Sequence, residues 1–139
     1  MVDHLSKEAR SRVMSRIRGQ DTKPELMVRS ALHSAGFRFR LHRRDLPGRP
    51  DIVLPRYRTV IFVHGCFWHG HSCSRGKLPA SNRDFWTKKI GRNKQRDAAN
   101  CVVLQRLGWN VIVMWECVLT ESLPSTIQYL SRAKISMEL

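Results

Sequence analysis

The stretch Thr59-Val-Ile-Phe-Val63 decides the fold, and it runs directly into the densest chemistry of the chain, His64-Gly-Cys-Phe-Trp-His-Gly-His-Ser-Cys73. A β-branched and aromatic run of this kind is typical of a buried strand. Asp51-Ile-Val-Leu54 is a second strand-like run, and the intervening Pro55-Arg-Tyr-Arg58 is typical of a turn. We therefore expect a hairpin whose second strand ends at a functional site.

Two helices are expected before this hairpin. The first covers residues of about 6–18, and Gly19 ends it. The second begins at Thr22-Lys-Pro-Glu25, a capping-box spacing with a hydroxyl at the cap and a carboxylate three residues later. Gly36 ends this second helix, and its broad apolar side is expected to consist of Leu26, Met27, Ala31 and Leu32.

Further elements are expected on either side of the hairpin. The alternation in Phe37–Leu41 predicts a half-exposed strand, and Asn110–Trp115 predicts another buried one. A helical pattern covers Arg83–Leu107, with Gly91 as a candidate point of interruption, and a last helix is expected to begin near Pro124. This order predicts an α/β fold with a mixed central sheet flanked by helices, in one domain over residues 1–139.

The composition points to a polyanionic partner. Lys and Arg outnumber Asp and Glu by 25 to 11, which gives a formal net charge of +14. Nucleic acid is the first candidate and an anionic membrane surface the second. No run reaches the ~18 apolar residues of a spanning helix, and the first residues lack the apolar run of a signal peptide. We expect no membrane partner and a cytoplasmic location, where the four cysteines stay reduced.

Three potential zinc ligands, Cys66, His71 and Cys73, fall within eight residues. Zinc favours four sulfur or imidazole ligands. Cys117 is the preferred fourth, because it ends a predicted strand, whereas Cys101 lies within a helical run and is expected in the core. A closed site with four ligands would be structural. Two alternatives remain open: the cysteines are unrelated thiols, or His64 and His69 are rival zinc ligands.

A second site is predicted where the hairpin strands end. Asp51 starts one strand, His64 ends the next, and His69 follows five residues later. Phosphodiester cleavage needs a divalent ion and a group that activates water. A carboxylate suits Mg²⁺, and a neutral imidazole suits a general base. Alternatively, Asp51 hydrogen-bonds within a turn, and Glu25 is only a capping carboxylate.

Aromatic residues accompany both the cysteine–histidine segment and a basic helical run. Phe67 and Trp68 lie inside the first, and Trp86 lies in Arg83–Lys89. Rings amid positive charge are typical of surfaces that hold phosphates while aromatic side chains stack on bases. The alternative is that Phe85 and Trp86 pack in the core, and we expect one of the two to do so. Trp109 and Trp115 adjoin predicted strands and are expected in the core.

Taken in order, these segments resemble the very-short-patch repair (Vsr) endonucleases. The matching segments are Leu46-Pro-Gly-Arg-Pro-Asp51, Val60-Ile-Phe-Val-His-Gly-Cys-Phe-Trp-His69, His71-Ser-Cys73, Phe85-Trp86, Lys89-Ile-Gly-Arg-Asn93, Leu107-Gly-Trp109 and Val113-Met-Trp-Glu-Cys117. The resemblance runs from about Ser6 to Thr120 and implies a restriction-endonuclease-like fold. In that superfamily, proline–aspartate is followed on the next strand by acid-x-lysine. Here Pro50-Asp51 fits the first part, and Phe62-Val63-His64 replaces the second.

The resemblance also implies roles for individual residues. Asp51 would bind Mg²⁺ together with the main-chain carbonyl of Val63, where a known member has threonine. His69 would be the general base, His64 a second catalytic imidazole, and Glu25 would support the site. Structural Zn²⁺ would be held by Cys66, His71, Cys73 and Cys117. Contacts to DNA would come from the helix at about 6–18 and from Phe67, Trp68, Trp86, Lys89, Asn93 and Met14, with the three aromatic residues as a wedge.

The implied reaction is a nick in one strand of duplex DNA, 5′ to the thymine of a T:G mismatch. Such mismatches arise when 5-methylcytosine is deaminated, so the functional partner would be a cytosine-5 DNA methyltransferase, and the enzyme is expected to act as a monomer. Two other hypotheses remain: a restriction-type endonuclease that cuts an undamaged site, and a non-catalytic zinc module that binds DNA. The second would leave Asp51, His64 and His69 without a role.

Overall fold

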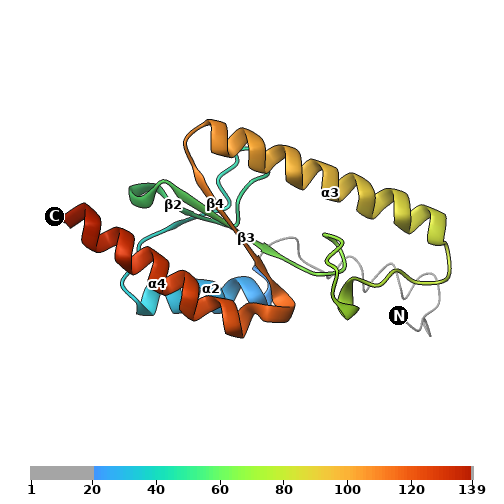
Figure 1. Cartoon of the computed structure of the whole chain (residues 1–139), viewed down its shortest axis with the longest axis horizontal. Helices are drawn as coiled ribbons and strands as arrows, with labels where there is room; N and C mark the ends of the chain where they lie inside the picture. Colours follow the sequence, from blue (N-terminus) through green and yellow to red (C-terminus); the bar gives the residue numbers. More distant parts are fainter. Residues whose placement is uncertain (1–20, 139) are drawn as a thin grey trace.

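The computed structural model describes residues 21–138 (Figure 1). Its sheet has four strands in the order β1-β2-β3-β4, with bounds Arg40–Leu41, Ile52–Leu54, Thr59–His64 and Asn110–Trp115. Neighbours from β1 to β3 are antiparallel, and β4 runs parallel to β3. The mixed sheet and its hairpin are as predicted, with the 3-10 helix η1 (Pro55–Tyr57) as the turn. The helix expected at about 6–18, and Met14 within it, lie outside the described residues.

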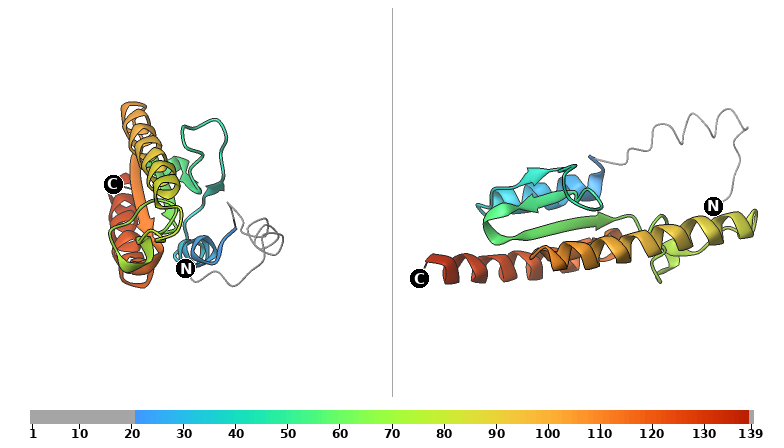
Figure 2. Two further views of the ribbon diagram at one scale, coloured as in Figure 1. Left: turned by 90° about the vertical axis from the view of Figure 1, so that its right-hand side faces the viewer. Right: turned by 90° about the horizontal axis from the view of Figure 1, so that it is seen from above.

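Helices cover both faces of the sheet. In Figure 1, α2 (Lys23–Ser34) and α4 (Leu119–Glu138) lie below it, and α3 (Arg83–Arg106) lies above it. Figure 2 shows that the first half of α3 extends beyond the sheet, alongside the segment that follows β3. Within residues 21–138, none of the helices has the length and apolar character needed to cross a membrane.

The core explains why β3 is an unbroken apolar run. Ile61 and Val63 pack with α2 and α4, whereas Val60 and Phe62 pack towards α3 and Trp109. Every residue of β3 is buried. A strand covered on both faces has no solvent-facing side and therefore shows no alternation.

The start of α2 follows the predicted cap. The Thr22 hydroxyl accepts a hydrogen bond from the Glu25 N–H at 3.4 Å, and the Glu25 carboxylate accepts one from the Asp21 N–H at 3.0 Å. The expected apolar side is partly wrong, because Leu26 and Met27 are half-exposed. The buried residues of α2 are Glu25, Val28 and Leu32.

Three other expectations about the elements are corrected. Only Arg40–Leu41 of the expected strand is paired in the sheet. Phe37 lies in the core and Phe39 packs against it, but neither belongs to a strand. The helix α3 continues through Gly91, whose side-chain position faces open space. The last helix begins at Leu119, which is buried in the core, and it contains Pro124.

Candidate functional site

A cleft of about 760 Å³ opens where β3 ends. Because β2 runs antiparallel to β3, the start of β2 lies at this edge, and the parallel β4 ends there too. The topology thus gathers residues from distant parts of the sequence. The residues expected to be catalytic, together with Val63 as an expected magnesium ligand, line this cleft, namely Glu25, Asp51, Val63, His64 and His69.

The Asp51 carboxylate is held by the backbone of β3. Its Oδ2 accepts a hydrogen bond from the Val63 N–H at 2.7 Å. In an extended strand the N–H and C=O of one residue point to the same edge, so the Val63 carbonyl faces the same side as Asp51. Burial, opposed by the Val63 hydrogen bond and reinforced by nearby Glu25, raises the pKa of Asp51 to about 7. Asp51 is therefore a desolvated carboxyl group, and a bound cation would favour its ionised form.

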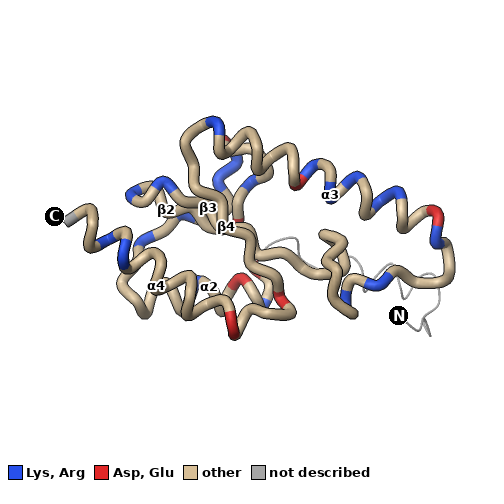
Figure 3. The backbone as a smooth tube through the Cα atoms, in the orientation of Figure 1, with Lys and Arg blue, Asp and Glu red and all other residues tan. Residues whose placement is uncertain are grey.

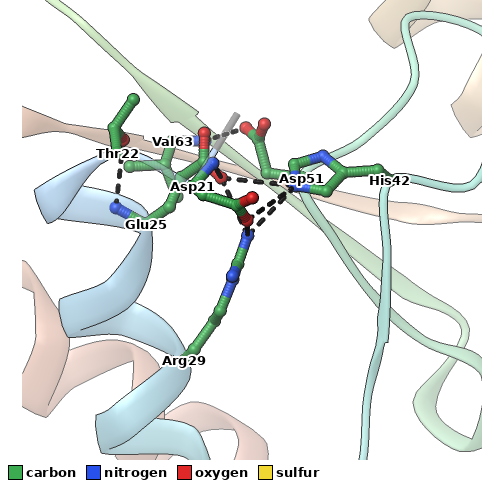
Figure 4. A network of polar contacts seen from close by, with 7 residues as sticks. All are labelled: Asp21, Thr22, Glu25, Arg29, His42, Asp51 and Val63. Atoms are coloured by element: carbon green, nitrogen blue, oxygen red, sulfur yellow. Dashed lines mark hydrogen bonds and ion pairs between the residues drawn. The ribbon is translucent and has the colours of Figure 1, made fainter. Parts of the chain in front are cut away.

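Glu25 lies beside Asp51 in a polar network (Figure 4). Its side chain is buried, and its Oε2 accepts a hydrogen bond from Arg29 Nη2 at 3.1 Å. The same Nη2 donates to Asp21 at 2.7 Å and lies 3.0 Å from His42 Nε2. Ligand atoms of Asp21, Glu25 and His42 lie within 4.8 Å of one another, but Arg29 already supplies a positive charge among them.

His64 and His69 form a stacked pair. Their ring centroids lie 3.7 Å apart, and the ring planes differ by 1°. His64 is only 5% exposed, and burial, followed by the neighbouring His69, lowers its pKa to about 4. His64 is therefore neutral near pH 7. Its Nδ1 is buried and has no hydrogen-bond partner among residues 21–138.

Asp97 is a residue of the cleft that the sequence did not single out. Its Oδ2 lies 2.6 Å from His69 Nδ1. A carboxylate at this nitrogen favours the tautomer with the proton on Nδ1, which leaves Nε2 free to accept a proton. The available signal was weak: Asp97 is an acidic residue in a basic helix, one turn after Asn93.

The predicted cysteine–histidine residues meet beside this cleft. One ligand atom from each of Cys66, His71, Cys73 and Cys117 lies within 4.8 Å of the others, a group that could hold a metal ion. His64 and His69 group with Asp97 instead. Cys101, expected in the core, is half-buried. Burial raises the pKa of Cys66 to about 12, whereas a hydrogen bond with His71 lowers that of Cys73 to about 6.

The three predicted wedge residues also come together. The rings of Phe67, Trp68 and Trp86 meet edge to face, with centroids 5.1 to 5.9 Å apart, and all three are half-buried. Trp68 lines the cleft as well. Contrary to expectation, neither Phe85 nor Trp86 is a core residue, since Phe85 is 56% exposed.

Helix α3 supplies the basic surface next to these rings. Figure 3 shows Lys and Arg recurring along it. Lys89 is exposed, with Nζ 5.9 Å from the centre of the Phe85 ring. The Asn93 amide also makes a contact within the chain, because its Nδ2 donates to the Trp68 carbonyl at 2.9 Å. Trp109 is buried as expected. Trp115 is half-buried, and its ring contacts His64 of the stacked pair and His71 of the cysteine–histidine group.

Comparisons with known proteins agree on one family. The family model described as DNA mismatch endonuclease Vsr matches residues 2–75. The type II nicking enzyme V.XorIIP of Xanthomonas oryzae pv. oryzae is 54% identical over 121 residues, which cover 87% of this chain and 89% of that protein. The type II nicking enzyme V.NmeAIP of Neisseria meningitidis is 50% identical over 119 residues, which cover 86% of this chain and 85% of that protein. DNA mismatch endonuclease Vsr of Escherichia coli is 47% identical over 119 residues, which cover 86% of this chain and 76% of that protein. The chain belongs to the Vsr family of DNA endonucleases and nicking enzymes.

Proposed function

We propose that this protein is a Mg²⁺-dependent endonuclease that nicks one strand of duplex DNA, 5′ to the thymine of a T:G mismatch. One observation carries the proposal. A single cleft is lined by a carboxylate suited to a divalent ion, Asp51, by the imidazole His69 with its carboxylate partner Asp97, and by Trp68 of the aromatic cluster. Groups that hydrolyse a phosphodiester thus lie next to groups that stack on bases.

Mg²⁺ is proposed to bind Asp51 and the main-chain carbonyl of Val63, with Glu25 in support. The donor set fits, because these are oxygen ligands and a bound cation would offset the burial that raises the pKa of Asp51. The ion would neutralise charge that develops on the phosphate. Valine serves at position 63 as well as threonine would, because the main chain provides the contact.

The two histidines of the stacked pair are proposed to have different catalytic roles. We assign His69 as the general base, since Asp97 holds Nδ1 and leaves Nε2 to take a proton from water. The positive charge that then arises on His69 lies next to the neutral His64 and the Asp97 side chain. His64 stays uncharged near pH 7 and can donate one N–H to the phosphate.

Substitution of Asp97 by asparagine is expected to lower kcat by roughly 100-fold with little change in KM. The amide keeps the size of the side chain but loses the charge that orients and stabilises the His69 ring. Steady-state nicking kinetics measure the effect. Asp84→Asn, an exposed acidic residue on the same helix, is the control and should behave as wild type. A kcat for Asp97→Asn within twofold of that control would contradict the role.

Activation by Mg²⁺ is expected to weaken below about pH 7. The pKa of Asp51 is raised to about 7, so below that pH a proton occupies the carboxylate and competes with the ion. The Mg²⁺ concentration for half-maximal nicking should rise about tenfold per unit of pH below about 7 and level off above about 8. Mg²⁺ titrations at several pH values measure this. A half-maximal concentration that stays constant from about pH 5.5 to 8 would oppose it.

Zn²⁺ is proposed to bind Cys66, His71, Cys73 and Cys117 as a structural ion. The soft ligand set fits, since three thiols and one imidazole converge and a cation would offset the cost of ionising the buried Cys66. Four protein ligands leave no open position for water. The ion would therefore fix the segment that carries Phe67, Trp68 and His69.

The aromatic cluster is proposed to open the duplex at the mismatch. Inserting rings between bases costs less at a weakly stacked T:G step than at a paired one. Lys89 and the other basic residues of α3 would hold the phosphates, with Asn93 and Met14 as further contacts. We also propose a single restriction-endonuclease-like domain that acts as a cytoplasmic monomer, in repair of the T:G mismatches left by a cytosine-5 DNA methyltransferase.

A second candidate is site-specific nicking of undamaged DNA, which the type II nicking names of two relatives favour. Two duplexes of one sequence, with either T:G or T:A at one position, separate the candidates. We expect nicking of the T:G duplex alone, in the thymine strand, within methyltransferase recognition sites. Equal nicking of both duplexes would support the second candidate, and cuts in both strands would support a restriction-type endonuclease.

A further inference from the structure

We infer that Trp115 is a positioning residue that holds the catalytic pair, His64 and His69, against the cysteine–histidine cluster. The inference rests on the proposed function, because it assigns Trp115 a part in that reaction. Trp115 ends β4, and the parallel register of β3 and β4 pairs it with His64. It is half-buried, so its ring contributes less to the core than to the edge of the sheet where the cleft opens.

One indole ring contacts three imidazoles. Trp115 stacks on His71 with centroids 4.2 Å apart and an interplanar angle of 19°. It meets His64 edge to face at 5.1 Å and 74°, and the His69 centroid lies 6.4 Å away at the same angle. His71 belongs to the cysteine–histidine cluster, whereas the other two form the catalytic pair. Trp115 therefore belongs to both sites.

The catalytic pair depends on such packing for its orientation. Nδ1 of His64 has no hydrogen-bond partner among the described residues, so ring contacts fix the plane of this imidazole. Those contacts are with His69, Trp115 and Phe62. His69 in turn stacks on His64 and is tied to Asp97. Loss of the indole would remove one of the three ring contacts that orient His64 and would loosen the ring on which His69 stacks.

The segment that carries His69 is irregular, and α3 supports it through the contacts of Asp97 with His69 and of Asn93 with Trp68. Residues 65–73 contain no helix or strand, and backbone hydrogen bonds within the segment link Gly65 to His69 and Cys66 to His71. The two residues after Trp115 anchor it from β4: Glu116 Oε1 accepts the Cys66 N–H at 3.1 Å, and Cys117 joins the cluster. These anchors do not involve the Trp115 side chain, so variants at Trp115 should keep the proposed zinc ion.

Trp115→Leu and Trp115→Phe test the role in the full chain. For Trp115→Leu we expect kcat for nicking, at saturating Mg²⁺, to fall about tenfold or more, because small misplacements of catalytic groups cost about that much or more. KM should stay within about twofold and bound zinc at the wild-type level. Trp115→Phe retains an aromatic ring and should restore most of kcat. Trp109→Leu is the control: it removes a tryptophan from the core and should lower Tm without lowering kcat.

A second measurement does not depend on cleavage. The Nδ1 proton of His69, hydrogen-bonded to Asp97, should give a downfield NMR signal that is lost in Asp97→Asn. We expect Trp115→Leu to broaden or abolish this signal and Trp115→Phe to keep it. An unchanged signal and kcat in Trp115→Leu would overturn the inference, as would loss of zinc in parallel with kcat. If the wild type fails to nick T:G DNA, the proposed function fails, while this signal still decides whether Trp115 positions His69.

Discussion

Asp51→Asn is expected to lower the nicking rate by at least about 1000-fold while the protein stays folded. Asparagine keeps an oxygen that can accept the Val63 N–H, now bonded to Asp51 at 2.7 Å. It removes the negative charge that the proposed Mg²⁺ site needs. Single-turnover nicking of a T:G duplex measures the rate, and circular dichroism checks the fold.

The same substitution should stabilise the metal-free protein at high pH. The pKa of Asp51 is about 7 in the folded chain against an ordinary 3.8, so the folded state holds the proton more tightly than the unfolded state. The protonated Asp51 carboxyl therefore contributes stability to the metal-free wild type that is fully present below about pH 3.8 and is lost as pH rises towards about 7. Asparagine carries no charge at any pH. With a chelator present, Asp51→Asn should have a higher Tm than wild type above about pH 7 and a similar Tm near pH 4.

Asp45→Asn is the matched control for both effects. Asp45 lies on the same connection between β1 and β2, but it is exposed and pairs with Arg43 at the surface. Its substitution should change neither nicking nor Tm appreciably. Nicking by Asp51→Asn within tenfold of this control would contradict the assigned role, and so would an unfolded Asp51→Asn protein.

Cys73→Ser is expected to destabilise the whole domain and to abolish stoichiometric zinc binding. A structural zinc site contributes about 10–16 kcal/mol of apparent binding free energy in small zinc domains, and part of this is free energy of folding. The cluster joins the segment after β3 to Cys117 after β4, so its loss frees both from each other. Thermal melting with atomic absorption measures stability and metal content together.

Cys101→Ser controls for loss of a thiol outside the cluster. Cys101 lies on α3, is half-buried and does not belong to the four-residue group. The Cys101→Ser protein should keep its full zinc content and nearly the wild-type Tm. A Cys73→Ser protein that melts like wild type, or a wild type that keeps its Tm after its zinc is removed, would refute the structural role.

The sheet could be predicted because its central strands are buried on both faces. Thr59–Val63 and Ile52–Leu54 have no polar face, so their apolar runs mark strands directly. The strand predicted over Phe37–Leu41 was too long, because Phe37 and Phe39 pack with the core but are not part of β1. The predicted start of the last helix near Pro124 was too late. A proline often marks the first turn of a helix, but this helix begins at Leu119, which is buried in the core.

The site could be predicted where its residues follow one another in sequence. The residues from His64 to Cys73 carry most of both sites, and Asp51 is one strand away. Asp97 and Arg29 reach the cleft network from α3 and α2. The Arg29–Glu25 pair has an i,i+4 helical spacing, whereas Asp97 meets His69 only because α3 packs against the sheet edge, which no local spacing encodes. Trp115 looked like a core residue because its strand is apolar, yet it lies at the strand end, where two sites meet.

The most direct test of the proposed activity is strand cleavage of one T:G duplex by the wild-type protein, with and without Mg²⁺, with both strands end-labelled. We predict a single product, cut 5′ to the mismatched thymine, that forms only with Mg²⁺ and leaves the guanine strand intact. Cleavage that needs no divalent ion, or that occurs elsewhere or in both strands, would contradict it.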